Sequence, residues 1–478
     1  MTTKLHHAPL ALVAGLGASG RAAIEWLAAR GWRVRAADTR EAPSGLEALR
    51  AAHPEAEIRT GGLPVSLLDG VSMLVMSPGL STVTGAAAPL VAAARESGVE
   101  VVGEIELFAR ELARLRDEKG YAPKVLGITG TNGKTTTTVL TTRMCAHAGL
   151  RAVAAGNIGP NAVTELLKAE AADELPDVWV LELSSFQLDT TTSLRLTAGA
   201  LLNITEDHVD WHGSMDAYAA AKAKIFTPGA VAVVNRDDAG ALRRAECATG
   251  PIRTFGAEAP KVPGDAGLVD APGGAVLVCG DAVIAPERDL LIAGRHNAMN
   301  AMAAWLLAGA AGAPEAARRE ALLTYRGEAH RVERVFTHEG VDVVDDSKGT
   351  NVGAVEAAVK GFAAQGRRLL IILGGDGKGQ DFSPLAAALK ARTGGVALIG
   401  RDAPAIEAAL GDVGAEKRRF GTLEEAVAWL WSLKRPGDVL LLSPACASWD
   451  MFRDYAHRSR VFIEAAKKLA GLPLKEVR

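Results

Sequence analysis

A glycine-rich loop between an apolar run and a helical segment contains the residue types that bind nucleotide phosphates. The run VLGITGTNGKTTT occupies residues 125–137, and its loop ends on Gly133, Lys134 and Thr135. Glycines let backbone N–H groups approach phosphate oxygens, the lysine supplies a cation for the β- and γ-phosphates, and the threonine hydroxyl can bind Mg²⁺. The spacing departs from GxxxxGK[ST] because Ile128 stands in place of the first glycine. The strand, loop and helix context still favours nucleotide binding over an ordinary turn.

A second glycine loop, GLGASG at 15–20, lies near the start of the chain. It fits GxGxxG, and Asp38 ends the next apolar run, where a dinucleotide-binding enzyme places its ribose-binding acid. A dinucleotide fingerprint, a UDP-sugar diphosphate site and a plain helix-packing turn all fit this pattern. Two phosphate loops in separate blocks suit two nucleotide substrates better than one redox cofactor.

An acidic residue interrupts an apolar run that has the composition of a fully buried strand. Glu182 lies in DVWVLELSSFQ, and an uncompensated carboxylate there is costly, so it requires a metal or a cation. A buried salt bridge is the alternative. The next strand leads into ITEDHVDWH, where His208 stands among carboxylates, either beside a metal or phosphate or simply in solvent.

The helical segment SMDAYAAAKAKIF carries a lysine on its apolar side. Met215, Tyr218, Ile225 and Phe226 recur at spacings of three and four, and Lys222 falls on the same stripe. Its amine either serves a site or extends along the apolar surface to reach water. Lys224 points elsewhere and is expected in solvent.

Three loops in the last third of the chain follow apolar runs. They are DDSKGTN at 345–351, GGDGKGQDF at 374–382 and SPACASWDMF at 443–452. Open α/β sheets bind ligands at the carboxyl ends of their strands. Each loop contains groups that contact anions, and each taken alone is equally consistent with a turn or helix cap.

Short apolar runs alternate with helical segments in three successive blocks, which predicts mainly parallel sheets flanked by helices. We expect three α/β domains, namely a Rossmann-like N-terminal one (1–103), a P-loop ATPase-like central one (104–327) and a Rossmann-like C-terminal one (328–478). The predicted strands are the run ending at Val13 and residues 33–37, 73–76, 99–102, 125–128, 179–183, 200–204, 230–234, 341–344, 369–373, 396–399 and 439–442. The predicted helices include 21–30, 104–120 and 298–307.

Composition agrees with folded structure throughout the chain. The 478 residues are 48% hydrophobic and 23% charged, and the net charge of −3 offers no basic surface for nucleic acid. The four cysteines lack a CxxC pair, so we expect small buried core residues instead of disulfides or a zinc site. No apolar run reaches the roughly 18 residues of a membrane helix. We therefore expect a cytoplasmic protein without membrane insertion.

With these loops in order, the chain resembles the Mur ligases over essentially its whole length. The shared motifs include GLGASG, GITGTNGKTTT, GNIG, LELSSFQL, NITEDHVD, GRHNAMNA, DDSKGTN, GGDGK and SPACAS. The branch that adds D-glutamate to UDP-N-acetylmuramoyl-L-alanine is the most similar. The resemblance implies an ATP-dependent ligase of peptidoglycan synthesis, hence of cell wall formation and cell division, with ATP as co-substrate, two Mg²⁺ sites, an acyl-phosphate route and a monomeric enzyme.

The resemblance also implies roles for individual residues. The catalytic set would be Lys134, Glu182, His208 and Lys222, and the metal ligands would be Thr135, Glu182, His208 and a carbamylated Lys222. ATP would be bound by Gly130, Thr131, Asn132, Gly133, Lys134, Thr135, Thr136, Asn157, Asn297, Asn300, Arg331 and Asp346. The UDP substrate would be bound by Ala18, Ser19, Asp38, Thr39, Arg40, Ser77 and Gly79. D-glutamate would be bound by Thr350, Lys378, Ser448 and Tyr455.

The chain departs from the family pattern at two positions. Arg295 stands where the family often has an acid, and Tyr455 stands where phenylalanine is common. Other functions remain to be separated: a sister ligase for another amino acid, a folylpolyglutamate synthetase, a catalytically inactive UDP-sugar-binding regulator, and a nicotinamide dehydrogenase based on GLGASG and Asp38 alone.

Overall fold

Three β-sheets, each flanked by helices, make up the chain in the computed structural model. The structure describes residues 8–292, 294–377, 379–390 and 392–473. The chain forms two compact units, Met1–Glu287 with Met299–Leu323, and Arg288–Ala298 with Thr324–Arg478. The first unit contains the two sheets that precede residue 287, and the second contains the third sheet. The predicted class of three α/β domains is therefore confirmed.

The N-terminal sheet has five parallel strands in the order β3-β2-β1-β4-β5. Its strands are β1 (Leu10–Ala14), β2 (Arg33–Asp38), β3 (Glu57–Thr60), β4 (Val71–Met76) and β5 (Glu100–Gly103), and its helices are α1 (Ala18–Ala29), α2 (Leu46–Ala52), α3 (Ala88–Glu96) and α4 (Glu104–Lys119). Every residue of β1 is buried because helices cover both faces of the sheet. The order reverses between β1 and β4, so the loop after β1 lies at a topological switch point, where such sheets bind ligands.

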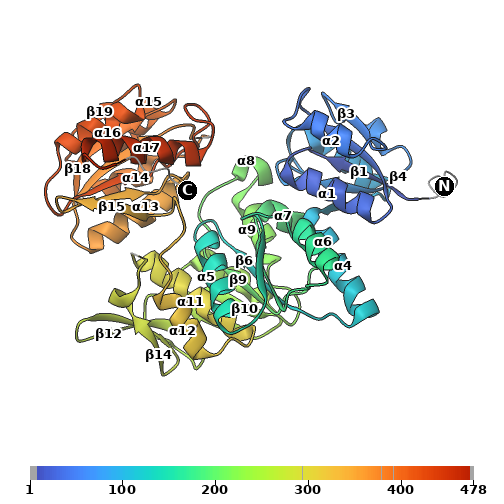
Figure 1. Ribbon diagram of the computed structural model, residues 1–478, viewed down its shortest axis with the longest axis horizontal. Helices are drawn as coiled ribbons and strands as arrows, with labels where there is room; N and C mark the ends of the chain where they lie inside the picture. The colour runs from blue at the N-terminus through green and yellow to red at the C-terminus, as the bar shows by residue number, and fades with distance from the viewer. Residues whose placement is uncertain (1–7, 293, 378, 391, 474–478) are drawn as a thin grey trace. The chain divides into compact units, whose positions relative to one another are not determined.

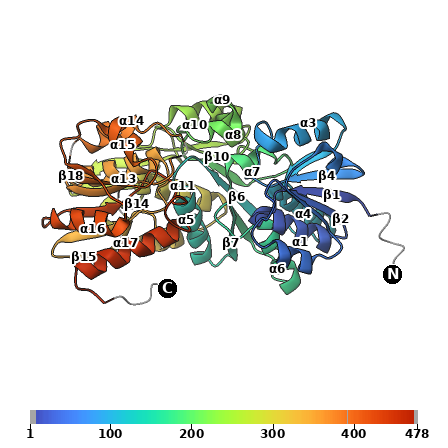
Figure 2. The ribbon, with the colours of Figure 1, turned by 90° about the horizontal axis from the view of Figure 1, so that it is seen from above.

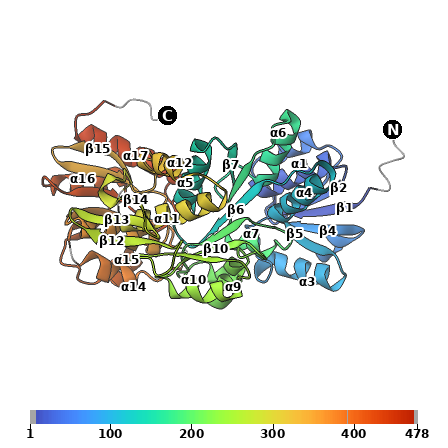
Figure 3. The same ribbon diagram turned by 90° about the horizontal axis from the view of Figure 1, so that it is seen from below.

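Helix α4 links the first sheet to the second within the same unit. It lies near α1 and α6 (Ala162–Ala172) in the views from above and from below (Figures 2 and 3). Arg30, just after α1, forms ion pairs with Glu111 of α4 and Glu170 of α6. The N-terminal helices therefore pack directly on helices of the middle sheet.

The middle sheet has nine strands in the order β14-β13-β12-β11-β10-β9-β6-β8-β7. Its strands are β6 (Lys124–Thr129), β7 (Ala152–Gly156), β8 (Val178–Glu182), β9 (Ala198–Leu201), β10 (Val231–Asn235), β11 (Ile252–Phe255), β12 (Ala266–Ala271), β13 (Gly274–Cys279) and β14 (Ala282–Pro286). The remaining helices of this region are α5 (Lys134–His147), α7 (Ser185–Asp189), α8 (Val209–His212), α9 (Met215–Ala223), α10 (Ala239–Arg244), α11 (Arg295–Ala310) and α12 (Glu315–Leu323).

Strands β12, β13 and β14 form an antiparallel extension of this sheet (Figure 3). It was not predicted from the sequence, because short strands are stabilised by cross-strand partners that their own residues do not specify. In β12 the first three residues are buried and the last three are partly or fully exposed, and the buried residues of β13 are Leu277 and Val278.

The third sheet has six strands in the order β15-β16-β20-β17-β18-β19. Figure 1 labels three of them, β15, β18 and β19. Its strands are β15 (Glu333–His338), β16 (Val341–Asp345), β17 (Leu369–Gly374), β18 (Thr393–Ile399), β19 (Lys417–Arg419) and β20 (Val439–Leu442), and its helices are α13 (Val352–Ala364), α14 (Ser383–Leu389), α15 (Ala403–Leu410), α16 (Leu423–Ser432) and α17 (Tyr455–Leu469). Alternate residues of β17 pack on opposite helical layers: Ile371 faces α13, α14 and α15, whereas Ile372 faces α16 and α17. Only β15 runs antiparallel to its neighbour.

The described cysteines depart from the expectation of buried core residues. Cys145 and Cys446 are buried, but Cys279 is partly exposed and Cys247 is exposed at the end of a short surface helix, so that expectation was wrong for Cys247. All four are free thiols. Within the described ranges, no helix is both long and apolar enough to span a membrane.

Candidate functional site

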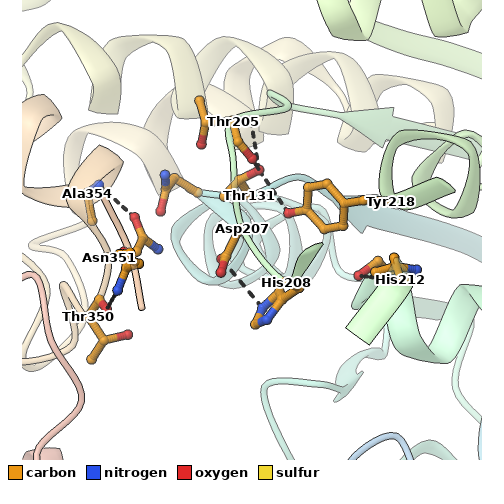
Figure 4. Close-up of polar contacts among 12 residues, drawn as sticks. Thr131, Thr205, Asp207, His208, His212, Tyr218, Thr350, Asn351 and Ala354 are labelled. Carbon is orange, nitrogen blue, oxygen red and sulfur yellow. Dashed lines mark hydrogen bonds and ion pairs between the residues drawn. The ribbon is translucent and has the colours of Figure 1, made fainter. Parts of the chain in front are cut away.

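The loop between β6 and α5 has the conformation of a phosphate-binding loop. Gly133 precedes α5 with φ of +84°, and Gly130 has φ of +153°, values that favour glycine. A Cβ at Gly133 would lie 2.3 Å from Oδ1 of Asn300, so Asn300 packs directly on the loop. Thr131 contacts the backbone of Thr205 and the hydroxyl of Tyr218 (Figure 4). These contacts fix the loop from three separate segments.

The lysine of this loop folds back over it. Lys134 donates to the carbonyl oxygens of Gly130 and Thr131, both at 2.8 Å. It is the first residue of α5, at the end where the helix dipole and unpaired N–H groups favour anions. Thr136 is buried in the same turn, and the Asn132 amide donates to Oδ1 of Asn203 at 2.8 Å. The lysine, the glycines and the helix terminus therefore lie together in one loop.

Glu182 ends β8 beside this loop and is 2% exposed. The Thr135 hydroxyl donates to Oε2 at 2.8 Å, and Nδ2 of Asn157 donates to Oε1 at 2.6 Å. Both donors are neutral, so this geometry does not support the alternative of a buried salt bridge. A carboxylate and a hydroxyl in contact make a set of hard oxygen donors, which suits Mg²⁺.

Lys222 lies at the end of α9 and is 2% exposed, so its amine does not extend to water. Nζ donates to the Gly130 carbonyl oxygen at 2.9 Å and lies 4.6 Å from the ring centroid of Tyr218. Desolvation and the nearby charge of Lys134 lower the pKa of Lys222 well below its usual range, against a smaller opposing effect of Asp207. Lys224 is exposed, as predicted, and donates to the Asp189 carbonyl.

His208 stands at the start of α8 in a left-handed backbone conformation (φ 54°) that is uncommon outside glycine. Its Nε2 lies 3.4 Å from Oδ2 of Asp207 (Figure 4), and its ring contacts Phe186 edge to face. Tyr218 lies near both His208 and Lys222, so one aromatic ring connects two of the predicted site residues.

His212 belongs to the same aromatic cluster but was not assigned a role from the sequence. Its Nε2 is 2.9 Å from the Ser185 hydroxyl, and its ring stacks on Phe186. Burial lowers the pKa of His212 to about 4, so the imidazole is neutral. It therefore serves as packing for the segment that carries His208.

The first glycine loop is fixed by Asp38, which ends β2. Oδ2 of Asp38 accepts from the Leu16 amide at 2.7 Å, and Arg40 donates to both carboxylate oxygens. Hydrogen bonds from Arg40 lower the pKa of Asp38 to about 2. A Cβ at Gly20 would lie 1.8 Å from the Gly15 carbonyl oxygen. The last position of the motif therefore requires glycine, because the helix and the loop pack closely there.

The other predicted UDP-binding residues lie around this loop. Ser77 follows β4 and approaches Gly15, since a Cβ at that glycine would lie 3.2 Å from its hydroxyl. Ala18 and Ser19 begin α1, whose N-terminus has no side-chain cap, and Ala18 is exposed. Thr39 is half-buried, while Arg40 and Gly79 are exposed. The structure thus collects these residues at the carboxyl ends of β1, β2 and β4.

The second unit brings the predicted third-domain loops together at the carboxyl ends of β16, β17 and β20. Gln380 links them, since Oε1 accepts from the Val352 amide at 3.1 Å and Nε2 donates to the carbonyls of Gly377 at 2.9 Å and Ala445 at 3.3 Å. Thr350 is half-buried, and the next residue, Asn351, caps α13 by accepting from the Ala354 amide (Figure 4). Lys378 lies outside the described residues.

Asp346 is buried immediately after β16. Ser443 donates to its Oδ2 at 2.6 Å and the Val332 amide to its Oδ1 at 3.2 Å. Burial raises the pKa of Asp346 to about 7, against a smaller lowering effect of Arg331. Asn297 is buried one turn before Asn300 on α11.

Ser448 is buried, whereas Tyr455 is exposed at the start of α17 and has Lys348 over its ring. Arg458, one turn further along α17, is fully buried and bonds to two of the loops. Its burial could not be predicted from the sequence, because a single arginine in an amphipathic helix is ordinarily exposed.

Three family models match the chain in succession. They are described as the Mur ligase MurD-like N-terminal domain (residues 10–103), the Mur ligase middle domain (128–308) and the Mur ligase glutamate ligase domain (330–446). The chain is 50% identical over 490 residues to the UDP-N-acetylmuramoylalanine--D-glutamate ligase of Ralstonia nicotianae, covering 97% of both chains. It is also 50% identical over 494 residues to the ligase of the same name from Burkholderia pseudomallei, again covering 97% of both.

Solved structures share the fold at low sequence identity. A MurF ligase from Thermotoga maritima, solved with ADP, aligns over 98% of this chain and 96% of its own with a TM-score of 0.61 and 16% identity. Escherichia coli FolC aligns over 77% of this chain and 94% of its own, with a TM-score of 0.56 and 18% identity. From the three family models and the full-length relatives together, the chain belongs to the Mur ligase family.

Proposed function

We propose that this protein joins the carboxylate of UDP-N-acetylmuramoyl-L-alanine to the amine of D-glutamate at the expense of ATP. The observation that carries the proposal is the 50% identity, over 97% of both chains, to relatives that bear this name. That coverage includes all the loops described above. The reaction belongs to peptidoglycan precursor synthesis and is placed in the cytoplasm, with the enzyme acting as a monomer.

ATP binds at the loop between β6 and α5. Its phosphates take the place of the Gly130 and Thr131 carbonyls as partners of the Lys134 ammonium. The N–H groups at the start of α5 face the same anion. Asn157, Asn297 and Asn300 contact the nucleotide, and Arg331 and Asp346 complete the ATP contacts.

Two Mg²⁺ ions accompany the nucleotide. Thr135 and Glu182 hold the first, and their contact at 2.8 Å supports a shared oxygen-donor site. His208 and the modified Lys222 hold the second. Mg²⁺ held by these residues would supply positive charge against the phosphate oxygens and the charge that develops during transfer.

Lys222 carries a carbamate in the active enzyme. Its neutral amine attacks the carbon of CO₂ and loses one proton, which leaves a carboxylate on the nitrogen. Lys222 shares the Gly130 carbonyl with Lys134, and two ammonium groups on one acceptor repel each other. Burial and this repulsion both favour the amine that carbamylation requires.

The UDP moiety binds at the first glycine loop. The N–H groups of Ala18 and Ser19 at the uncapped start of α1 face the diphosphate. Thr39, Arg40, Ser77 and Gly79 surround it, and Asp38 holds the loop through the Leu16 amide.

D-glutamate binds at the loops of the second unit, with Lys378 opposite a carboxylate and Thr350, Ser448 and Tyr455 as further contacts. Arg295 and Tyr455 depart from the common family residues, so contacts at the adenosine and at the glutamate side chain differ there from the usual pattern.

The chemistry follows in two displacements. The substrate carboxylate attacks the γ-phosphorus of ATP and releases ADP, which gives an acyl phosphate. The D-glutamate amine then attacks the acyl carbon, and the tetrahedral adduct expels phosphate as the amide forms. Lys134 and the α5 N-terminus stabilise the negative charge of the transferring phosphoryl group.

ADP release by the purified protein with UDP-N-acetylmuramoyl-L-alanine and a panel of amino acids tests this function. We expect turnover with D-glutamate. Equal turnover with L-alanine or a diamino acid would instead identify a sister ligase. Release with a folate substrate would identify a folylpolyglutamate synthetase.

A further inference from the structure

A buried arginine connects two of the loops at the proposed amino-acid site. Arg458 lies on the first turn of α17 and is 0% exposed. Its guanidinium donates from Nε to the Ser347 hydroxyl at 3.0 Å, from Nη2 to the Ser347 carbonyl at 2.7 Å, and from Nη1 to the Cys446 carbonyl at 3.1 Å. Three donors of a rigid planar group therefore reach three fixed acceptors.

The acceptors belong to the loops that carry proposed substrate contacts. Ser347 lies three residues before Thr350 in the loop after β16, and Cys446 lies two residues before Ser448 in the loop after β20. The Ser347 hydroxyl in turn donates to the carbonyl of Tyr455 at 2.7 Å. One side chain thus links the segments that hold Thr350, Ser448 and Tyr455.

The cost of burying this cation indicates more than ordinary packing. All three hydrogen bonds of Arg458 go to uncharged oxygens, so no carboxylate bonds to it directly. The neighbouring Asp345 carboxylate is engaged instead by His330, by the Ser459 hydroxyl and by the Ser347 amide. Desolvation lowers the pKa of Arg458 to about 10, and the side chain remains protonated near neutral pH. A buried charge without a direct counterion weakens stability relative to an apolar residue.

We propose that Arg458 is a positioning residue for the amino-acid substrate, which holds the loops after β16 and β20 in the geometry that binds D-glutamate. This inference rests on the proposed function. Arg458 acts through preorganisation: loops that are already fixed in the binding geometry do not lose conformational entropy when the ligand binds. Arg458 itself does not contact the substrate.

Arg458→Lys separates this role from general stabilisation. Lysine keeps the charge but has a single nitrogen, which cannot reach acceptors on both loops in the arginine geometry. We expect KM for D-glutamate to rise at least tenfold, while KM for ATP and for the UDP substrate stay within twofold. Arg460→Lys, on the same helix but partly exposed, is the matched control and should leave all three KM values unchanged.

A purely structural role predicts a different result: a lower melting temperature and less active enzyme, but unchanged KM values in the folded fraction. A folded Arg458→Lys protein with wild-type KM for D-glutamate would overturn the proposal. If that variant does not fold, Ser347→Ala tests the positioning role instead, because this change removes only the hydroxyl that lies between Arg458 and Tyr455. We expect at least a threefold rise in KM for D-glutamate, and an unchanged KM refutes the positioning role. Absence of D-glutamate turnover in the wild-type enzyme would contradict the proposed function instead.

Discussion

Replacing Lys222 by alanine tests the chemistry proposed for the central site. The side chain is buried, and its nitrogen shares the Gly130 carbonyl with Lys134. Because each nitrogen lies within 2.9 Å of that oxygen, the two nitrogens are at most about 6 Å apart. At an effective dielectric constant of about 20, two positive charges at that distance repel by about 3 kcal/mol. Two protonated lysines here are therefore unfavourable, whereas a neutral amine at Lys222 removes the repulsion and a carbamate converts it to attraction.

Lys222→Ala should lower kcat by about 100-fold or more, since loss of one electrostatic stabiliser typically costs on the order of 3 kcal/mol in the transition state. Folding should be little affected, because the alanine removes a buried polar group together with its desolvation cost. The assay is ADP release with all three substrates, measured with and without small carboxylates such as acetate or formate. Added carboxylate should restore part of the rate by occupying the vacated anion site.

Lys224→Ala is the matched control. Lys224 is exposed two residues away, donates to the Asp189 carbonyl at 2.6 Å and lies 3.9 Å from Oδ1 of Asp189. Exposed ion pairs contribute little, so its removal should be nearly silent. Near-wild-type activity of Lys222→Ala without added carboxylate would refute the reasoning, because the lysine would then have no part in catalysis.

Four further perturbations have definite expected outcomes. Lys134→Ala should lower ligation by about 100-fold yet leave UDP-substrate affinity intact by calorimetry, and loss of that affinity would show that the two nucleotide sites are not separate. Lys378→Ala should raise KM for D-glutamate tenfold or more, since a charge-assisted hydrogen bond contributes roughly 1.5–3 kcal/mol. An unchanged KM would contradict the assignment of Lys378 to D-glutamate binding. Burial lowers the pKa of His212 from 6.5 to about 4. Between these two pH values the unfolded chain binds a proton at this residue that the folded protein does not bind. The free energy of unfolding therefore decreases by up to about 3 kcal/mol as the pH falls through this range. In denaturant unfolding between pH 4.5 and 7, the free energy of unfolding of His212→Gln should depend less on pH than that of the wild type. The same pH dependence in both proteins would exclude His212 as the cause. Gly20→Ala should destabilise the protein by about 2 kcal/mol or more, because its Cβ would lie 1.8 Å from a loop carbonyl oxygen. Gly17→Ala is the control: its Cβ would meet no atom closer than 3.9 Å, so its melting temperature should change little.

The sequence by itself determined the features that depend on local spacing. Apolar runs alternating with helical segments predicted the parallel strands, since strands buried on both faces need continuous apolar residues. The phosphate loop was recognisable because its lysine and glycines are adjacent in the chain. The position of Lys222 on an apolar helical stripe was consistent with a site residue or with a side chain that reaches water, and its 2% exposure excludes the second.

Tertiary structure alone decided the contacts between distant segments. The hydrogen bond from Lys222 joins residues 92 positions apart, and that from Arg458 joins residues 111 positions apart. No periodicity encodes such a pairing, because it depends on how strands order themselves in a sheet. The antiparallel strands β12, β13 and β14 were missed for a related reason: short strands are stabilised by cross-strand partners, which their own sequence does not specify. The burial of Arg458 could not be predicted from its own helix for the same reason. A buried arginine needs hydrogen-bond acceptors, and two separate loops supply them here.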